Sequence, residues 1–486
     1  MSAVNWLEHA VGRSDYQPIK VVGRGSYGTV WSCTRRKNNT SCALKKVKAL
    51  FDVKLDTIRV LRELQFLRLL RHPNVIHATD VLRPTDRSKY NEVNIVFDLF
   101  DTDLASLIRS PTVYGLDHAR WIFFQLLHAL RYLHRLNIFH RDIKPGNILL
   151  NADCDVKLCD FGLARAKVTG SDTMPMFWSD YVCSRWYRAP ELICCHTARN
   201  AGGVDMWSAG CILAELFTRR PLFRGGDSAG QLREICTVAG HPSQKMIDGV
   251  TSASVREYLE GFEEQERVSL KSVVPQADDV AHDLLLSILT FDPAERFDAE
   301  QALEHEFFCE LSKLPAASRI EDFCAATPPP NLELDMQASS SLQNMSVAAL
   351  RECIYREIMM YHELEHPVVE ASEPVQTHAQ ESRPERRVQF PVTDSTNDAH
   401  DMDVSCSPHP QSSSGDDSAG SADSTGSEDK FARRMSCTAA REPVSGCVHA
   451  EQDKPVMRTR SHSDHSHQMY QPWRNPTSPM SPLAAA

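Results

Sequence analysis

The apolar and polar positions of residues 16–100 indicate short strands interrupted once by a helix. The first part is rich in Val, Tyr and Trp and is broken by glycines and by Lys37-Asn38-Asn39. Runs of this kind, bounded by turn residues, favour strands, and we predict them at Tyr16–Gly25, Gly28–Arg35 and Thr40–Val47. The apolar period becomes helical from Lys54 to Leu70. Two further strands are expected near Asp80–Leu82 and Val93–Phe97.

After about Leu104 the chain is mainly helical in its pattern. Two β-rich pieces, Ile148–Leu150 and Val156–Leu158, interrupt it and flank a tight turn. The main helices of this part are predicted at Asp117–Leu136, Val204–Thr218, Gly230–Val238 and Asp279–Leu289. The whole pattern indicates an α+β fold in which a small β-rich lobe precedes a larger, mainly helical lobe.

The last third of the chain divides into an irregular segment, one helix and a tail. Residues 310–346 carry Pro315, a run of three prolines and a serine run, so we expect an irregular strap. An amphipathic helix should follow, because apolar residues recur at helical spacing: Val347, Leu350, Ile354, Ile358 and Tyr361. Beyond Glu365 no periodicity survives, and we expect disorder because this composition cannot bury enough apolar surface.

These patterns predict four segments. They are an N-terminal extension (1–15), a two-lobed domain (16–308, with lobes of about 16–100 and 101–308), a C-terminal strap and helix (309–365) and a Ser-rich acidic tail (366–486). Of the net charge of −11, the tail holds 11 Lys and Arg against 17 Asp and Glu, a net of −6. Net charge therefore says little about the surface of the predicted domain.

Composition excludes several classes of function. The apolar stretches contain polar residues and fall short of the ~20 residues that a membrane span needs, so no membrane partner is expected. No secretory signal is visible at the N-terminus. The 15 cysteines lack CxxC spacing, which argues against zinc or disulfides and fits a reducing compartment. Net acidity argues against nucleic-acid binding.

The first chemical motif is Gly23-Arg24-Gly25-Ser26-Tyr27-Gly28-Thr29-Val30. Glycines let a backbone approach phosphate oxygens closely, but an ordinary glycine turn and a dinucleotide-binding loop are rival explanations. The dinucleotide loop needs a helix after the glycines, whereas the sequence after Gly28 is strand-like. Lys45 stands 17 residues after Gly28. We therefore predict a strand–turn–strand flap with a cation on the next strand.

The second motif is His140-Arg141-Asp142-Ile143-Lys144-Pro145-Gly146-Asn147, followed by Asp160-Phe161-Gly162 and Ala189-Pro190-Glu191. In this order the motifs resemble the eukaryotic protein kinase family over about residues 16–310. The resemblance implies the two-lobed protein-kinase fold and transfer of the ATP γ-phosphate to Ser or Thr of protein substrates, with ATP and Mg²⁺ as cofactors.

The resemblance also implies a role for each motif residue. Lys45 would hold the α- and β-phosphates and Glu63 would fix Lys45, although Glu63 alone could be a solvated helix residue. Asp142 would orient the substrate hydroxyl and accept its proton, and Lys144 would steady the γ-phosphate. Asn147 and Asp160 would bind Mg²⁺. The nucleotide would contact Gly23, Arg24, Gly25, Ser26, Tyr27, Gly28, Val30, Ala43, Phe97, Asp98, Phe100 and Cys159. Glu191 is expected to pair with Arg296.

Within the kinases, Ser179-Asp180-Tyr181 resembles the Thr-x-Tyr activation lip of the mitogen-activated protein (MAP) kinases. The hinge segment Asp98–Leu104 and the helix segment Leu350–Glu357 resemble the same family, in which the C-terminal helix returns to the small lobe. By this resemblance, phosphates on the two lip residues would be bound by arginines: Arg62, Arg141 and Arg165 for Ser179, and Arg185 and Arg188 for Tyr181.

Three departures from the MAP kinase pattern are visible. Ser179 replaces Thr, Phe97 is a bulky residue at the back of the nucleotide pocket, and no acidic docking cluster directly follows Phe308. Candidate docking acids lie further on, at Glu321, Asp322, Glu333 and Asp335.

The expected partners are substrates with Ser/Thr-Pro sites, an upstream dual-specificity MAP kinase kinase, and phosphatases. The expected location is the cytoplasm, and a second location in the nucleus is left open. The alternative function is a catalytically weak, kinase-fold scaffold that acts through its tail and docking surfaces. No expected catalytic position is lost, which favours the enzyme.

Overall fold

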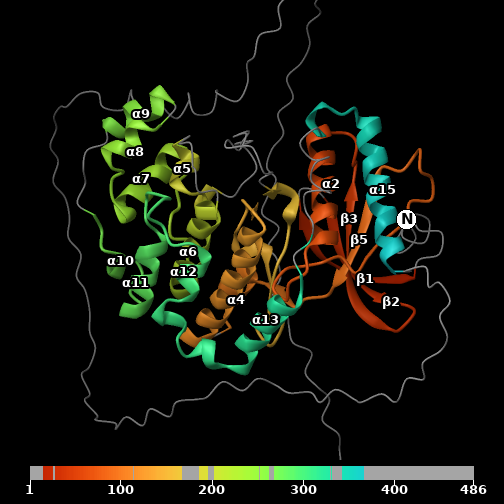
Figure 1. The fold of residues 1–486 in the computed structure, drawn as a ribbon, viewed down its shortest axis with the longest axis horizontal. Helices are drawn as coiled ribbons and strands as arrows, with labels where there is room; N and C mark the ends of the chain where they lie inside the picture. Colours follow the sequence, from red (N-terminus) through yellow and green to blue (C-terminus); the bar gives the residue numbers. More distant parts are fainter. Residues whose placement is uncertain are drawn as a thin grey trace, which may run out of the picture.

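A small lobe built on a β-sheet and a larger helical lobe make up the structure, as Figure 1 shows. The computed structural model describes residues 15–25, 28–112, 114–166, 185–194, 202–250, 252–261, 267–328, 330 and 342–365. The predicted order, a β-rich lobe before a helical lobe, is confirmed. Several predictions lie outside the described residues: the N-terminal extension apart from Asp15, Ser26, Tyr27, Ser179, Tyr181, Glu333, Asp335 and the tail 366–486.

The small lobe is a five-stranded antiparallel sheet with the strand order β1-β2-β3-β5-β4. Its strands are β1 (Tyr16–Gly25), β2 (Gly28–Arg35), β3 (Thr40–Lys48), β4 (Asp80–Val81) and β5 (Glu92–Asp98). Helix α2 (Lys54–Leu69) covers one face of the sheet. Val47 of β3 and Ile95 of β5 are at most 3% exposed and share a core with Ile58 and Leu61 of α2. This packing fixes α2 above the strand that carries Lys45.

Two long helices, α4 (Leu116–Arg135) and α6 (Gly202–Thr218), form the centre of the large lobe. Both were predicted, and their ends differ from the prediction by at most two residues. Almost every residue of α6 is buried, because the helix is apolar on all sides. Around them lie α5 (Pro190–Ile193), α7 (Ser228–Ala239), α8 (Gln244–Asp248), α9 (Ala253–Glu260), α10 (Leu270–Val273), α11 (Asp279–Ile288), α12 (Ala299–Leu303), η3 (Arg185–Tyr187) and η4 (Glu306–Phe308).

Short strands and turns lie between the two lobes. β6 (Thr102–Asp103), β8 (Ile148–Leu150) and β9 (Val156–Leu158) form one sheet, and β7 (Ile138–Phe139) pairs with β10 (Arg165–Ala166). The other elements here are α3 (Leu104–Arg109), η1 (Pro145–Asn147) and η2 (Phe161–Leu163). The bounds of β8 and β9 are those predicted. This arrangement brings residues 140–147 and 160–162 together.

The prediction that residues 310–346 form an irregular strap is wrong for its first half. η5 (Leu311–Lys313) and α13 (Pro315–Ala326) are helical, and a short turn, η7 (Leu342–Asn344), follows later. Pro315 breaks no helix because it occupies the first turn of α13, where its missing N–H has no helical partner to lose. Ala317 and Ile320 give this helix a buried side.

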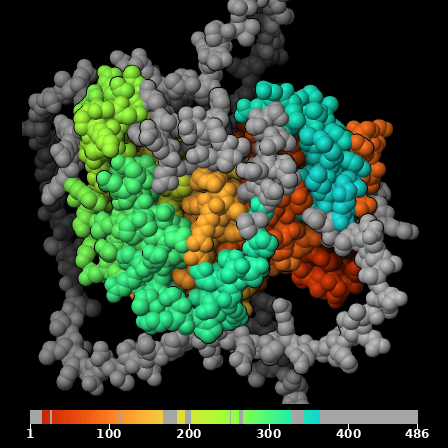
Figure 2. Space-filling view, viewed as in Figure 1, coloured from red at the N-terminus to blue at the C-terminus, as the bar shows by residue number. Residues whose placement is uncertain are grey.

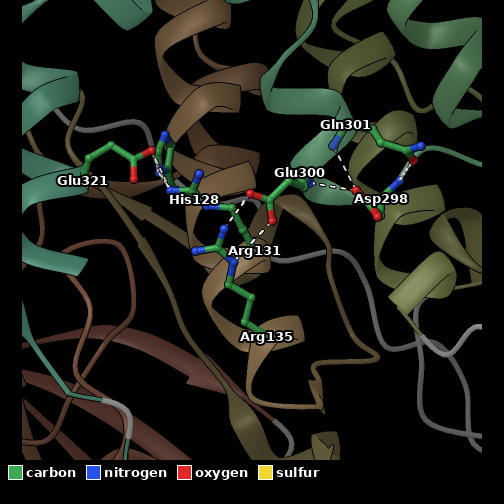
Figure 3. A network of polar contacts seen from close by, with 7 residues as sticks. All are labelled: His128, Arg131, Arg135, Asp298, Glu300, Gln301 and Glu321. Carbon is green, nitrogen blue, oxygen red and sulfur yellow. Dashed lines mark hydrogen bonds and ion pairs between the residues drawn. The ribbon is translucent and has the colours of Figure 1, made fainter. Parts of the chain in front are cut away.

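Ion pairs fasten α13 and α12 to α4, as Figure 3 shows. Glu321 of α13 accepts a 2.6 Å hydrogen bond from Arg131 and lies 3.7 Å from the ring of His128. Arg135 contacts Glu300 of α12 at 2.5 Å. Burial and the neighbouring Arg131 lower the pKa of His128 to about 3, so its ring is neutral near pH 7. One predicted docking acid, Glu321, is therefore engaged within the chain.

Helix α15 (Val347–Glu365) returns to the small lobe and lies beside α2, as the resemblance implies. Its predicted apolar face is buried at Leu350, Ile354, Ile358 and Tyr361. In the part of the chain that the structure describes, no helix combines the length and apolar character needed to cross a bilayer.

Candidate active site

The backbone of the loop from His140 to Asn147 is hydrogen-bonded to a buried carboxylate of α6. Asp205, which is 0% exposed, accepts hydrogen bonds from the backbone N–H groups of His140 (2.8 Å) and Arg141 (2.7 Å). It also contacts the ring of His134 at 3.0 Å. Arg141 has a positive φ of 69°, an unusual conformation for a residue with a side chain. Asp205 stabilises this conformation by accepting hydrogen bonds from the N–H of Arg141 and from that of the residue before it.

Asp142 lies at the centre of a compact polar group on this loop. Its Oδ2 accepts hydrogen bonds from Lys144 Nζ at 2.5 Å and from Asn147 Nδ2 at 3.1 Å. Asn147 Nδ2 also donates to the backbone carbonyl of Asp142 at 2.8 Å. The carboxyl group is thereby fixed in direction, with a cation beside it. Because the nitrogen of the Asn147 amide is used in this way, its oxygen is left to act as a ligand.

Asp160 is the second carboxylate of the site and begins the turn η2. It has a φ of 69°, so its backbone is in the left-handed region. The next residue, Phe161, is fully buried between the rings of Phe66 on α2 and His140, at 6.1 and 5.1 Å between centroids. Burial alone would raise the pKa of Asp160, but Lys45, His140 and Lys144 hold it below its usual value. Asp160 is therefore ionised at neutral pH.

Asp160 and Asn147 offer oxygen ligands of the kind that Mg²⁺ prefers, and Mg²⁺ usually takes only one or two protein carboxylates, with water and phosphate completing its shell. Among the described residues no group of three His, Cys, Asp or Glu side chains gathers as a metal-binding cluster. The two-oxygen donor set of Asp160 and Asn147 fits a metal that arrives with phosphate.

Lys45 and Glu63 form the predicted ion pair between β3 and α2. Lys45 Nζ lies 2.6 Å from Glu63 Oε1, and the two side chains are 19% and 7% exposed. Burial opposes the charge on Lys45, but the carboxylates of Glu63 and Asp160 outweigh it and raise the pKa of Lys45 above its usual value. Lys45 therefore carries a fixed positive charge near Asp160.

The strands around Lys45 bring the other predicted nucleotide-contacting residues together. Val30 pairs with Lys45 across β2 and β3, and Ala43 pairs with Phe97 across β3 and β5. Cross-strand partners share a face of the sheet, so these residues line one surface. Phe97 and Phe100 are half-buried and Asp98 is exposed at the end of β5.

The glycines of the flap differ in how much space surrounds them for a side chain. A side chain at Gly28 would collide with the backbone carbonyl of Lys46, since a Cβ would lie 1.9 Å from the oxygen. Close packing of β2 on β3 therefore explains Gly28. A Cβ at Gly25 would have no described atom within 4 Å, and Gly23 has only ordinary contacts with Val30. Arg24 is exposed. Gly25 leaves the open space that a ligand could enter.

Cys159 directly precedes Asp160 and is half-buried. Burial and the adjacent Asp160 raise the pKa of its thiol above the usual value, so the thiol is neutral. This environment fits a small, unreactive side chain beside the site.

A group of arginines lies on the inner side of α2. Arg62 is 7% exposed, and burial together with the charges of Arg141 and Arg59 lowers its pKa to about 10. Its Nε is buried without a hydrogen-bond partner among the described residues. Arg165 lies on β10, which pairs with β7, the strand that precedes the loop from His140 to Asn147. A cluster of like charges of this kind favours a bound anion.

The segment after the lip is anchored to the large lobe. Arg185 is exposed and donates a hydrogen bond to the carbonyl of Gly226, and Arg188 is half-buried. The predicted pair of Glu191 and Arg296 is confirmed: both side chains are 0% exposed, with contacts of 2.7 and 3.0 Å. This bidentate pair ties α5 to the loop before α12.

Two residues of the site were not predicted. Asp205 could have been suspected as an acid inside the apolar sequence Val204–Leu216, where a charge needs a partner. Arg59 lies three residues before Arg62, one helical turn away on the same side of α2. Both signals are visible in the sequence, but the groups that Asp205 binds lie more than 60 residues away in the chain.

Comparisons with known proteins agree with this geometry. The family model described as "Protein kinase domain" matches residues 16–308. Mitogen-activated protein kinase 4 of Oryza sativa subsp. japonica is 41% identical over 348 residues, which are 71% of this chain and 89% of the relative. Mitogen-activated protein kinase 7 of Arabidopsis thaliana is 39% identical over the same length and the same shares. Mitogen-activated protein kinase 3 of the same rice is 44% identical over 297 residues, 61% of this chain and 79% of the relative.

Proposed function

The chain belongs to the protein kinase family, and within it to the MAP kinases, and from this premise we propose that it phosphorylates Ser or Thr followed by Pro once Ser179 and Tyr181 are phosphorylated. That it is an ATP-binding serine/threonine protein kinase follows from the family. The observation that carries phosphoryl transfer, the chemical part of the proposal, is the gathering of two fixed carboxylates and two lysines between the lobes: Asp142, Asp160, Lys45 and Lys144.

Each group has a task that its surroundings support. Lys45, held by Glu63, would bind the phosphates of ATP with a charge whose direction is set in advance. Asp142 would accept a hydrogen bond from the substrate hydroxyl, orient its oxygen toward the γ-phosphorus and take up the proton as the new P–O bond forms. Lys144, at 2.5 Å from Asp142, would neutralise charge on the transferred phosphoryl group.

Asp160 and Asn147 would hold Mg²⁺ together with oxygens of the ATP phosphates. When bound, the metal would neutralise phosphate charge and so make the γ-phosphate a better electrophile. The low pKa of Asp160 supports this role, because the carboxylate is already ionised at neutral pH and needs no proton loss before it binds a cation.

Activation by phosphorylation is supported by the arginine group. A phosphate brings nearly two negative charges and three acceptor oxygens, which would offset the repulsion among Arg59, Arg62 and Arg141. Arg165 would join them at phospho-Ser179, and Arg185 and Arg188 would bind phospho-Tyr181. Because Arg62 adjoins Glu63 on α2, a phosphate bound there would also stabilise the ion pair with Lys45. An upstream kinase that accepts Ser and Tyr is the partner this requires.

The choice of Ser/Thr-Pro substrates rests on membership of the family, and two peptides test it. The fully phosphorylated chain, with Mg-ATP, should phosphorylate a Ser-Pro peptide at least tenfold faster than the matched Ser-Ala peptide. Equal rates on the two peptides would refute the proposed preference for proline but would not contradict kinase activity. The Ser179→Ala, Tyr181→Phe double variant should have low activity in the same assay, and full activity in it would remove the proposed mode of activation.

A further inference from the structure

Helix α15 is attached to α2 along most of its length. It stands beside α2 in Figure 1, and its side chains form part of the outer surface of the small lobe in Figure 2. Three apolar residues of α15 on the buried face, Leu350, Ile354 and Ile358, are at most 1% exposed. This apolar face holds α15 against α2, but hydrophobic contacts are not directional and do not by themselves fix one register of the two helices.

Directional contacts are added at three places. Arg68 Nε of α2 lies 2.5 Å from Glu357 Oε1, and the side chains are 11% and 5% exposed. The hydroxyl of Tyr361 donates to the backbone carbonyl of Leu64 at 2.6 Å. Before α15, the carbonyl of Gln343 accepts a 2.6 Å hydrogen bond from Lys54 at the start of α2. These contacts fit only one position of α2 relative to α15.

The same part of α2 carries Glu63. Leu64 is the next residue, and Arg68 lies five residues on, about 7.5 Å along the helix axis. A helix moves as a nearly rigid body, so α2 cannot turn or slide away from Lys45 without breaking the contacts of Arg68 and Leu64. The two ends of this connection are the C-terminal helix and the ion pair that orients Lys45.

We infer that Glu357 and Tyr361 are positioning residues of the active site, which hold α2 where Glu63 meets Lys45 and thereby set the affinity for the phosphates of ATP. The inference rests on the proposed function, in which Lys45 binds those phosphates. A buried ion pair is a poor source of stability compared with apolar residues of similar volume. Its use between Arg68 and Glu357 is better explained by the single register that it specifies.

The test is a double-mutant cycle that separates positioning from general packing. The affinity of the full chain for a fluorescent ATP analogue with Mg²⁺ is measured for the wild type, Glu357→Gln, Glu63→Gln and the double variant. If Glu357 acts through Glu63, Glu357→Gln should weaken binding about tenfold in the wild type but less than twofold once Glu63 is replaced. Equal losses in both backgrounds, or no loss in the wild type, would overturn the inference.

Two further variants guard against loss of folding. Arg68→Met with Glu357→Leu replaces the ion pair by apolar groups, which should preserve the unfolding temperature and still weaken ATP binding. Glu352→Gln is the matched control, because Glu352 lies on the same helix but pairs with the exposed Arg87 outside α2. Glu352→Gln should leave the affinity within twofold of wild type. A loss there equal to that of Glu357→Gln would contradict a specific role for Glu357.

Turnover on a Ser-Pro peptide is recorded in parallel. If the wild type phosphorylates the peptide but the losses of ATP affinity in the cycle are additive, this inference is overturned and the proposed function stands. If ATP affinity changes in the cycle as expected but the wild type transfers no phosphate to the peptide, the proposed function is overturned and the inference about Glu357 stands.

Discussion

Replacing Arg62 should stabilise the unphosphorylated protein, which is the reverse of the usual effect of removing a buried side chain. Burial and the charges of Arg141 and Arg59 lower the pKa of Arg62 from its usual value to about 10. One pH unit corresponds to about 1.4 kcal/mol, so the charged guanidinium is roughly 3 kcal/mol less favourable in the folded protein than in water. This cost is present at neutral pH and declines only as the pH rises through the folded pKa.

The substitution Arg62→Met keeps most of the apolar stem and removes the charge. We expect a gain of about 1–3 kcal/mol in the free energy of unfolding, which is less than the full cost because some packing is lost. The unfolding temperature should rise by about 2 °C per kcal/mol for a chain of this size. The measurement is urea and thermal unfolding of the full chain in a Ser179→Ala, Tyr181→Phe background, where the lip stays unmodified.

The same substitution at Arg68, six residues further along α2, is the matched control. It removes the Arg68 guanidinium from the buried ion pair with Glu357, whose side chain is 5% exposed. Removing one member of a buried pair costs about 3–5 kcal/mol, so Arg68→Met should lower the unfolding temperature. If Arg62→Met destabilises the protein as much as Arg68→Met does, the reasoning about the arginine group is wrong. In the natural lip, Arg62→Met should also abolish the rise in activity on phosphorylation.

Three further predictions concern groups that support the site. Asp205→Asn should reduce kcat at least tenfold with a smaller change in the KM for ATP, because the backbone of the catalytic loop loses its ionised acceptor; unchanged steady-state kinetics would contradict this. Glu191→Gln should destabilise the large lobe by about 3–5 kcal/mol in urea unfolding, since Arg296 keeps its buried charge, and a change below 1 kcal/mol would refute it. His128 has a pKa of about 3 in the folded protein, against an ordinary histidine value of 6.5, so the unfolded chain binds a proton first as the pH falls. Stability should therefore decline from pH 6.5 downward, by roughly 2 kcal/mol at pH 5. His128→Leu should reduce that slope by one proton, and an unchanged slope would contradict the assignment.

The strands of the small lobe, α2 and α15 could be predicted because their patterns are local. The period of apolar residues fixes which side of each element is buried, and the glycine and charged turn residues mark where the strands end. The ion pairs of Lys45 with Glu63 and of Glu191 with Arg296 were also predictable, because the motifs that contain them resemble a known family.

What the sequence does not reveal depends on where a residue lies in its helix or in the fold. The sequence predicts an irregular segment where α13 forms, because Pro315 looks like a break until its place at the helix start is known. The sequence predicts that Gly28 contacts phosphate, and the structure adds a second requirement for glycine there, because the carbonyl of Lys46 leaves no room for a side chain. Asp205 binds the backbone of His140 and Arg141, which lie more than 60 residues earlier in the chain, and no local pattern identifies such partners. Arg59 acts on Arg62 of the same helix, but only the fold shows that both are buried near Arg141.

The central claim is that Asp142 is the group that receives the substrate hydroxyl in phosphoryl transfer from ATP. The most direct measurement is the rate at which the phosphorylated full chain transfers the γ-phosphate of Mg-ATP to a Ser-Pro peptide, compared between wild type and Asp142→Asn. The asparagine keeps the size of the side chain but cannot accept the proton, so the rate should fall by at least a hundredfold while ATP affinity stays within about threefold. Transfer by Asp142→Asn at the wild-type rate would contradict the account.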